Sequence, residues 1–167
     1  MNANEAAFLM ALRHAEGTAG PNGYRTLFGG GLFGNDFVDH PRIAKQFTDK
    51  AGRRLWTTAA GAYQAMAISP IPGLPGNRLR STKLDTWDRI KKKLSLPDFT
   101  PESQDRFALE LIDECGATED VRAGRFAVAI TKCRGVWASL PGAGYSQPER
   151  SLAFLERAYR SAGGDLA

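Results

Sequence analysis

The residue of this sequence best placed to do chemistry is Glu16, at the end of an amphipathic segment. Phe8, Leu9 and Leu12 recur with the helical period, and on a helical wheel Glu16 lies within roughly 20° of Leu9 and about 40° of Leu12. Burial on this stripe and the negative end of the helix dipole would both raise the carboxyl pKa. A carboxylic acid that stays protonated near neutral pH can act as a general acid, and glycoside cleavage commonly uses one. The alternative is a glutamate in a frayed last turn that reaches into water.

A glycoside hydrolase normally pairs its acid with a second carboxylate. The nearest aspartates, Asp36 and Asp39, follow the glycine-rich stretch GGGLFG and could face such an acid. Aspartates in this kind of context are also common turn formers, because the side chain bonds the backbone two residues on. Both interpretations stay open at this point.

Other kinds of site find little support. The run Gly29-Gly30-Gly31 is not followed by the Gly-Lys-Ser/Thr of a phosphate loop, so a hairpin turn explains it better. His14 and His40 are the only histidines and have no ligand spacing around them, so we expect no metal site and no Ser-His-Asp triad. The basic clusters 91–93 and 53–54 lack interleaved aromatic residues, which argues against nucleic-acid binding.

Two further segments contain side chains suited to binding sugars. Tyr63 and Gln64 are adjacent, and the segment 139-SLPGAGYSQ-147 contains Tyr145. Tyrosine rings stack on sugar faces, and a glutamine amide can bond an N-acetyl group. The competing interpretation is a partly buried tyrosine and an ordinary surface loop.

The composition limits the classes of protein to which this chain can belong. The chain has 167 residues, 43% hydrophobic and 24% charged, which suits one folded domain. A net charge of +4 favours anionic partners without choosing among nucleic acid, wall polymer and membrane surface. Two cysteines, Cys115 and Cys133, are too few for a disulfide scaffold. The N-terminal segment has no basic n-region of a signal peptide, and no window approaches the ~20 apolar residues of a membrane span.

The hydrophobic periodicity and the residues typical of helix ends and turns predict a mostly helical α+β chain with a small β element near the N-terminus. Gly17 should end the first helix, the aromatic residues around the glycine run suggest a hairpin, and residues 69–82, with three prolines, suggest a loop. A Thr100-Pro101 cap and a capping box at 146–149 mark two later helix starts. The segments expected to be helical or hairpin are 4–15 (helix), 24–37 (hairpin), 57–66 (helix) and 85–94 (helix).

Six motifs in a fixed order resemble the bacteriophage lambda endolysin family. They are HAEGTAG-x-x-GY (14–24), GGGLF (29–33), DHPR (39–42), TTAAGAYQ (57–64), FTPESQD (99–105) and VWASLPGAGYSQ (136–147). The resemblance runs from about residue 6 to 164. It implies a lysozyme-like α+β fold, in which residues 1–167 form one catalytic domain with a small β lobe at about 24–56 and a cleft beside a helical lobe.

The resemblance also implies an activity, namely cleavage of the β-1,4 bond between N-acetylmuramic acid and N-acetylglucosamine in peptidoglycan. The family does this by lytic transglycosylation, in which one glutamate makes both proton transfers and a 1,6-anhydro product forms. The catalytic glutamate of the family's S-E-G-T motif falls on Glu16, with Ala15 in place of the serine. No metal or organic cofactor is implied. Tyr63, Gln64 and Tyr145 are the candidates for substrate binding.

Three functional hypotheses follow: a lytic transglycosylase, a hydrolytic muramidase assisted by Asp36 or Asp39, and a wall-binding module without catalysis. The partner expected in all three is the peptidoglycan glycan strand, with no nucleic acid, no stable membrane association and a monomeric protein. With no signal peptide, the chain is expected to accumulate in the host cytoplasm until a separate membrane-permeabilising protein releases it. Between Gln64 and Trp87 the chain carries extra residues relative to the family, either an inert loop or a rim with Arg78, Arg80 and Lys83.

Overall fold

The computed structural model describes residues 1–49, 51–69, 85–144 and 148–167. The chain divides by its internal contacts into two compact units, and the boundary falls inside one helix. Unit 1 contains Met1–Ala19 and Ala108–Ala167, and unit 2 contains Gly20–Phe107. Tyr145 and most of the extra segment between Gln64 and Trp87 lie outside the described residues.

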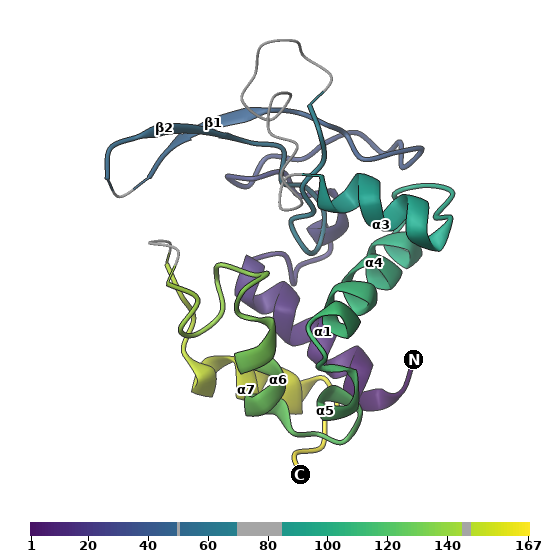
Figure 1. The fold of residues 1–167 in the computed structure, drawn as a ribbon, viewed down its shortest axis with the longest axis vertical. Coiled ribbons are helices and arrows are strands. Elements are labelled where there is room, and N and C mark those ends of the chain that lie inside the picture. Colours follow the sequence, from purple (N-terminus) through teal and green to yellow (C-terminus); the bar gives the residue numbers. More distant parts are fainter. Residues whose placement is uncertain (50, 70–84, 145–147) are drawn as a thin grey trace. The chain divides into compact units, whose positions relative to one another are not determined.

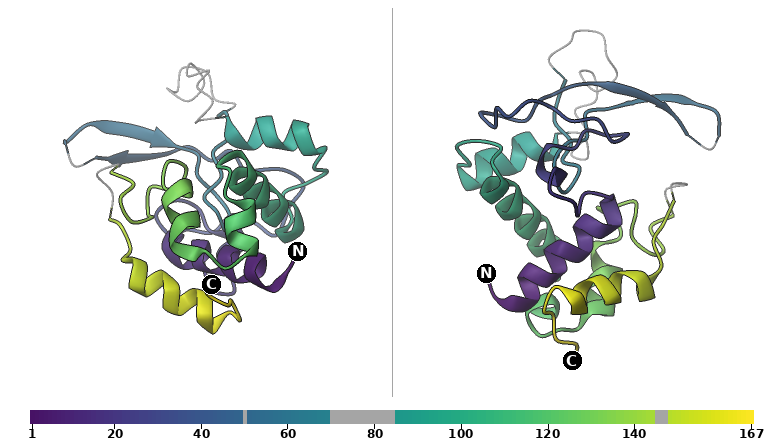
Figure 2. Two further views of the ribbon diagram at one scale, coloured as in Figure 1. Left: turned by 60° about the horizontal axis from the view of Figure 1, so that its bottom comes forward. Right: turned by 180° about the vertical axis from the view of Figure 1, so that it is seen from behind.

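Unit 1 is helical. It contains α1 (Ala3–Glu16), the second half of α4 (Pro101–Glu114), α5 (Thr118–Arg122), α6 (Phe126–Cys133) and α7 (Leu152–Ser161). α1 packs against α7 and α5, and two of the views show α1 and α7 crossing in contact (Figures 1 and 2). Aromatic rings from these helices pack together: the centre of the Phe126 ring lies 5.6 Å from the centre of the Phe8 ring and 4.7 Å from that of Tyr159. Burial of this apolar stripe, as the sequence periodicity predicted, stabilises α1.

Both ends of α1 are capped. At the start, Asn2 and Glu5 form a capping box, and the Glu5 carboxylate also accepts a 2.7 Å bond from Arg122. At the end, Gly17 takes the left-handed conformation, with φ +74°, and the Thr18 N–H donates to the Arg13 carbonyl at 2.8 Å. This arrangement closes the last turn and reverses the chain, as is usual when glycine follows a helix. The prediction that the first helix ends at Gly17 is confirmed.

Unit 2 contains a short 3₁₀ turn η1 (Gly23–Arg25), strands β1 (Lys45–Thr48) and β2 (Arg54–Thr57), helix α3 (Thr86–Leu94) and the first half of α4. The two strands pair antiparallel, with Lys45 opposite Thr57. An aromatic cluster fills the interior: the Phe99 ring lies 4.7 Å from Trp87, which lies 5.5 Å from Phe107. The predicted helix at 85–94 and the predicted helix start at Pro101 are both confirmed.

The strands lie further along the chain than the sequence predicted. Within 24–37 there is only an isolated bridge, between Thr26 and Leu32, around a tight glycine turn. The strands β1 and β2 instead occupy the polar region that follows. The hairpin predicted at 24–37 is therefore reduced to a single antiparallel bridge around the glycine turn, and the two paired strands follow it in the sequence.

Two predicted helix assignments were also wrong. Residues 58–66 form a compact irregular turn, closed where the N–H of Ala65 donates to the Ala60 carbonyl at 2.8 Å and the N–H of Ala60 returns a bond to Ala65. The last helix begins at Leu152, where the Ser151 side chain caps it. Glu149, expected in a capping box, instead accepts N–H bonds from Gly142 and Gly144, so it orders the preceding loop.

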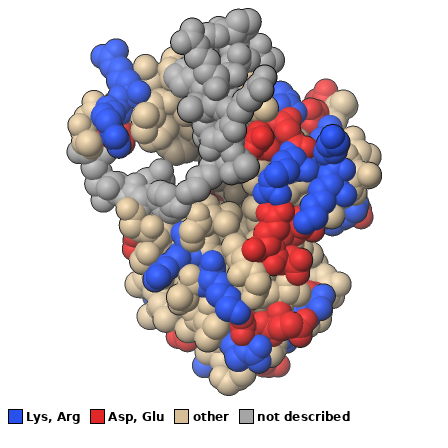
Figure 3. All heavy atoms as spheres, viewed as in Figure 1, with Lys and Arg blue, Asp and Glu red and all other residues tan. Residues whose placement is uncertain are grey.

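Three surface and chemical features complete the description. Among the described helices none combines the length and apolarity needed to cross a bilayer. Acidic and basic side chains intermingle around α3 in the view of Figure 3, so its lysines do not form a purely basic face. Cys115 and Cys133 are free thiols and hydrogen-bond to each other inside unit 1.

Candidate functional site

Glu16 occupies the last position of α1, and one of its carboxyl oxygens is held by a side chain far along the chain. The Ser139 hydroxyl donates to Glu16 Oε1 at 2.5 Å. The other oxygen, Oε2, has no hydrogen-bond partner among the described residues and is not one of their fully buried polar atoms. The carboxyl group is therefore anchored on one side and accessible on the other.

The environment of Glu16 favours the protonated acid. Burial raises the pKa of its carboxyl above the ordinary glutamate value, and the Ser139 hydrogen bond lowers it by a smaller amount. Burial raises the pKa because the charged carboxylate loses its hydration. The hydroxyl donor lowers the pKa because it stabilises the charged carboxylate by a hydrogen bond. The direction expected from the sequence agrees with this environment, and of the two causes predicted, burial and the negative end of the helix dipole, burial is the one that raises the pKa.

His14 and Arg13 share the last turn of α1 but do not approach the carboxyl group. The His14 ring packs edge-on against Phe154 of α7, with the ring centres 6.1 Å apart. Arg13 donates from Nε and Nη2 to the carbonyl of Thr18, at 3.3 and 3.2 Å. Arg13 therefore supports the reversal after the helix and His14 the packing of α1 on α7, and neither pairs with the Glu16 carboxyl group.

Gln64 lies in the irregular turn of unit 2 in a conformation unusual for a residue with a side chain, with φ +49°. Its Nε2 donates to the carbonyl oxygens of Gly61, at 3.0 Å, and Thr26, at 3.3 Å. Both partners are acceptors, so the amide orientation is determined and Oε1 is the outward atom. Within the described part of the chain, Oε1 has no donor of its own. Strained conformations of this kind persist where surrounding structure enforces them, and they are frequent at functional sites.

Tyr63, the neighbour of Gln64, is placed differently from a sugar platform. Its side chain is 3% exposed, and its hydroxyl donates to Asp105 at 2.6 Å. The hydroxyl of Tyr24 donates to the same carboxylate oxygen at 2.8 Å. A ring buried to this extent offers no free face for stacking, so the structure favours a role for Tyr63 in holding the turn that presents Gln64.

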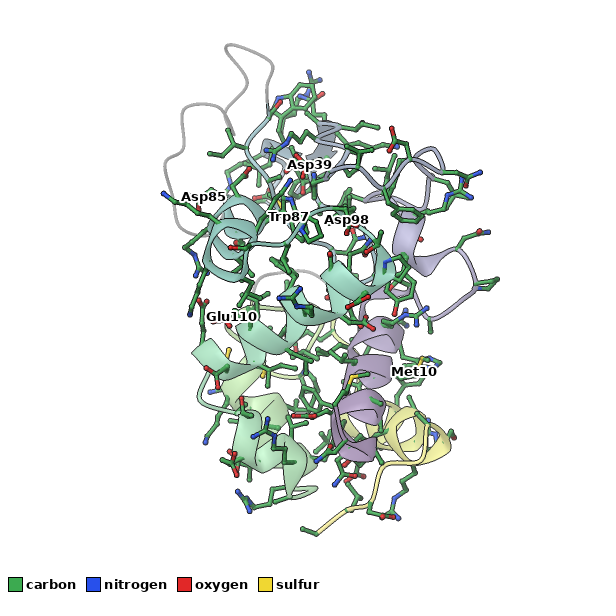
Figure 4. All side chains as sticks on the ribbon, turned by 90° about the vertical axis from the view of Figure 1, so that its right-hand side faces the viewer. Met10, Asp39, Asp85, Trp87, Asp98 and Glu110 are labelled. Carbon is green, nitrogen blue, oxygen red and sulfur yellow. The ribbon has the colours of Figure 1, made fainter. Side chains whose placement is uncertain are left out.

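Asp39 is engaged in a network inside unit 2. Its carboxylate accepts bonds from Lys91 at 2.9 Å, from the Trp87 indole at 3.0 Å and from Arg42 at 3.2 Å, and Figure 4 shows Asp39 beside Trp87. Partial burial alone would raise the pKa of Asp39, but these donors together hold it far below its ordinary value. A carboxylate so strongly stabilised is a poor base for activating water.

Asp36 and His40 also have local roles. Asp36 is exposed and accepts the Val38 N–H at 2.8 Å, the turn-forming bond that was its alternative interpretation. His40 is buried, bonds the Ala65 carbonyl through Nε2 at 2.9 Å, and has a pKa lowered by burial to about 4, so it is neutral at pH 7. No group of three or more potential metal ligands occurs among the described residues.

The sequence did not single out Ser139 as an individual residue. It marked the segment 139–147 because of Tyr145, which lies outside the described residues. The available signal was the apolar pair Trp137 and Leu140 on either side of Ser139, since both are now seen to be buried. A polar residue between two buried ones is a candidate for an inward-facing hydroxyl.

Comparison with known proteins places these features in a family. Residues 6–166 match the Endolysin family. The chain is 42% identical to the endolysin of Escherichia phage P2, over 96% of this chain and 93% of that protein, and 36% identical to the endolysin of Escherichia phage lambda, over 99% and 95%. The chain therefore belongs to the endolysin family.

Solved structures agree with the sequence relationship. Bacteriophage lambda lysozyme complexed with a chitohexasaccharide superimposes with a TM-score of 0.82 at 36% identity, covering 100% of this chain and 98% of that one. A second structure, lysozyme from bacteriophage lambda, gives a TM-score of 0.74 with the same identity and coverage. The prediction of a lysozyme-like α+β fold is confirmed.

The Asp39 network generates a prediction about stability. Asp39→Asn should lower the free energy of unfolding by about 1–2 kcal/mol at pH 7, because Arg42 and Lys91 lose their common counter-charge. The difference from wild type should shrink progressively below about pH 4, since the stabilisation from a depressed carboxylate pKa is complete above the unfolded-state pKa and is lost as the pH falls toward the folded-state pKa. Urea unfolding over a pH series measures both effects.

The matched control is Asp36→Asn, in which the new amide oxygen can still accept the Val38 N–H. It should leave unfolding unchanged within about 0.5 kcal/mol. Wall-degrading activity of Asp39→Asn should stay within a few-fold of wild type at a temperature where the variant is folded. A stable Asp39→Asn protein with a hundredfold loss of activity would instead give Asp39 a direct part in the reaction.

Proposed function

We propose that this endolysin degrades peptidoglycan by lytic transglycosylation, with Glu16 as the single catalytic carboxyl group. The observation that carries the proposal is the state of Glu16: a carboxyl group with a raised pKa, one oxygen anchored by Ser139 and the other accessible. The neighbouring candidates for a second carboxylate have other roles, Asp39 in an ion-pair network and Asp36 in a turn. A mechanism that needs one carboxyl group fits this inventory better than one that needs two.

In the proposed reaction Glu16 first acts as the acid. Its proton passes to the glycosidic oxygen as the bond from that oxygen to C1 of N-acetylmuramic acid breaks. The resulting carboxylate then accepts the proton of the C6 hydroxyl, and O6 bonds to C1 to close the 1,6-anhydro ring. The proton count balances, Glu16 ends as it began, and no water is consumed. The chemistry requires neither a metal nor an organic cofactor.

Gln64 is the residue of unit 2 that we propose contacts the substrate. Its outward Oε1 can accept a hydrogen bond from the N–H of an N-acetyl group, a feature of both sugars of peptidoglycan. The bonds to Gly61 and Thr26 hold the amide in one orientation before substrate arrives, which reduces the entropy lost on binding. Tyr63 contributes by holding the turn, and Tyr145 remains a predicted sugar contact.

The family relationship supports a proposal for the binding partner and the place of action of the protein. The lambda protein with the 0.82 TM-score is described in complex with a chitohexasaccharide, an N-acetylated glycan, which supports a glycan strand as the partner here. We propose a monomer that acts on the wall from the periplasm, after a separate membrane-permeabilising protein releases it from the host cytoplasm. Nucleic acid and stable membrane binding are not part of this function.

Removing the acid tests the proposal most directly. Glu16→Gln keeps the size and the acceptor for Ser139 but cannot donate or accept the catalytic proton, so degradation of purified peptidoglycan should fall by at least ~10³-fold. Circular dichroism and the urea midpoint should show an intact fold. Glu102→Gln, which neutralises an exposed carboxylate at the start of α4, is the control and should keep full activity. Activity of Glu16→Gln near the wild-type level would eliminate this mechanism.

The products distinguish transglycosylation from hydrolysis. Digestion in water enriched in heavy oxygen should give 1,6-anhydro ends without label, about 20 Da lighter than the corresponding hydrolysis products, which take up one labelled water. Mass spectrometry after complete digestion measures both features. Reducing ends that contain one heavy oxygen would establish a hydrolytic muramidase, and a folded wild-type protein that releases no products would establish a non-catalytic wall-binding module.

The Gln64 contact is tested by a pair of substitutions. Gln64→Gly removes the amide while tolerating the left-handed backbone, so the fold should persist and KM for soluble glycan strands should rise about tenfold. Gln64→Glu keeps the outward acceptor but replaces the donor to two carbonyl groups by a charge, and should weaken both stability and binding. Steady-state kinetics on purified strands provides the measurement. An unchanged KM in a folded Gln64→Gly protein would remove Gln64 from the binding site.

A further inference from the structure

The contact between Ser139 and Glu16 makes the two oxygens of the acid unequal. Oε1 accepts the serine hydroxyl, and Oε2 has no partner among the described residues. A carbonyl oxygen accepts a hydrogen bond better than the hydroxyl oxygen of a carboxylic acid, so a serine hydroxyl that donates to Oε1 favours the acid proton on the other oxygen. The acid proton is thus directed to Oε2, the accessible atom.

The segment around Ser139 is built to keep the hydroxyl in this place. Trp137 and Leu140 on either side are buried, at 3% and 0% exposure. The Leu140 N–H bonds the Trp137 carbonyl at 3.2 Å, and the carbonyl of Ser139 itself accepts the Arg150 N–H at 2.9 Å. The serine backbone is therefore held from both sides, which fixes the point from which the hydroxyl reaches Glu16.

We propose that Ser139 is the positioning residue of the proposed reaction: its hydroxyl selects Oε2 of Glu16 as the proton-carrying atom and stabilises the carboxylate that exists between the two proton transfers. This inference rests on the proposed function and goes beyond it, since it gives the acid and the base forms of one glutamate a common partner. When Glu16 is an acid, Ser139 orients it. When Glu16 is a carboxylate, the same hydrogen bond is stronger because its acceptor is charged.

The hydrogen bond from Ser139 also limits how far burial raises the Glu16 pKa. Burial raises the Glu16 pKa and the serine bond opposes it. Without the bond the acid would protonate the leaving oxygen less readily, because a weaker acid is a poorer donor. Among the described residues, five other titratable side chains share the last turn of α1 or the segment from α6 to α7 within unit 1: Arg13, His14, Arg134, Glu149 and Arg150. None of these five is among the causes of the Glu16 shift, whereas the Ser139 hydrogen bond is, so removing that bond should change the Glu16 pKa.

The experiment compares Ser139→Ala with Ser139→Thr. The alanine variant loses the hydrogen bond, so the Glu16 pKa should rise, and the alkaline limb of the kcat profile, where the acid deprotonates, should move to higher pH. We expect kcat at the optimum to fall about tenfold while KM stays within about twofold. The Ser139→Thr variant retains a hydroxyl, so it should restore most of the wild-type kcat and most of the wild-type Glu16 pKa. Titration of ¹³C-labelled Glu16 by NMR measures the pKa shift without any substrate.

The control for a purely structural effect is Ser151→Ala. It removes the cap of α7 in the same unit, where the side chain accepts the Phe154 N–H, and does not touch Glu16. This variant should be less stable than wild type, with an unchanged pH profile and an unchanged Glu16 titration.

Two outcomes would overturn the inference: a Glu16 titration in Ser139→Ala identical to wild type, or an alanine variant with wild-type kcat and pH limbs. Failure of the proposed function appears elsewhere, as retained activity in Glu16→Gln. In that case the NMR titration still reports whether Ser139 controls the protonation of Glu16.

Discussion

The end of α1 is the constraint on which the candidate site depends. The helix ends at Glu16, so the carboxyl group lies at the point where the chain reverses. Gly17 stops it by taking a left-handed conformation, and Thr18 then donates back to Arg13 across the last turn. The buried contact of Phe8 with Phe126 holds the helix in place and so determines where its last turn lies. Packing of an apolar stripe at one end of the helix thus determines where the acid lies at the other.

Two carboxyl groups of the chain show how environment decides function. Glu16 has burial and one neutral hydroxyl donor, and its pKa is raised. Asp39 is also partly buried, but an ammonium, a guanidinium and an indole donate to it, and its pKa is strongly lowered. The same functional group is therefore biased toward the protonated acid in one place and toward the anion in the other. For that reason a second carboxylate close by in the sequence is not evidence for a two-carboxylate mechanism.

The parts of the fold that could be predicted from sequence are those decided by local pattern. Helix α3 was predicted closely because Trp87 and Ile90 mark its buried face, and α4 because Thr100 and Pro101 mark its start. Glu16 was found in the same way, from its place on a helical wheel. Ser139 was not, since its partner is 123 residues away and only the folded chain brings the two together. Local pattern identifies candidate acids, whereas their hydrogen-bond partners depend on tertiary structure.

The turn that carries Gln64 was predicted as a helix, and a single buried side chain explains why it is not one. Gln104, 1% exposed, accepts the Ala62 N–H at 2.8 Å, a donor that would bond within the segment in a helix, and it is itself held by donating to the Phe99 carbonyl at 2.7 Å. At Gly61, where φ is +79°, a Cβ atom would lie 2.3 Å from the Gln104 side chain, closer than any side chain can fit. The alanine-rich sequence favours a helix locally, but a glycine at this contact and a buried amide 42 residues away outweigh that preference. Gln64 lies in this same turn with a positive φ, and the bonds of its Nε2 to Gly61 and Thr26 leave the amide oxygen without a partner among the described residues.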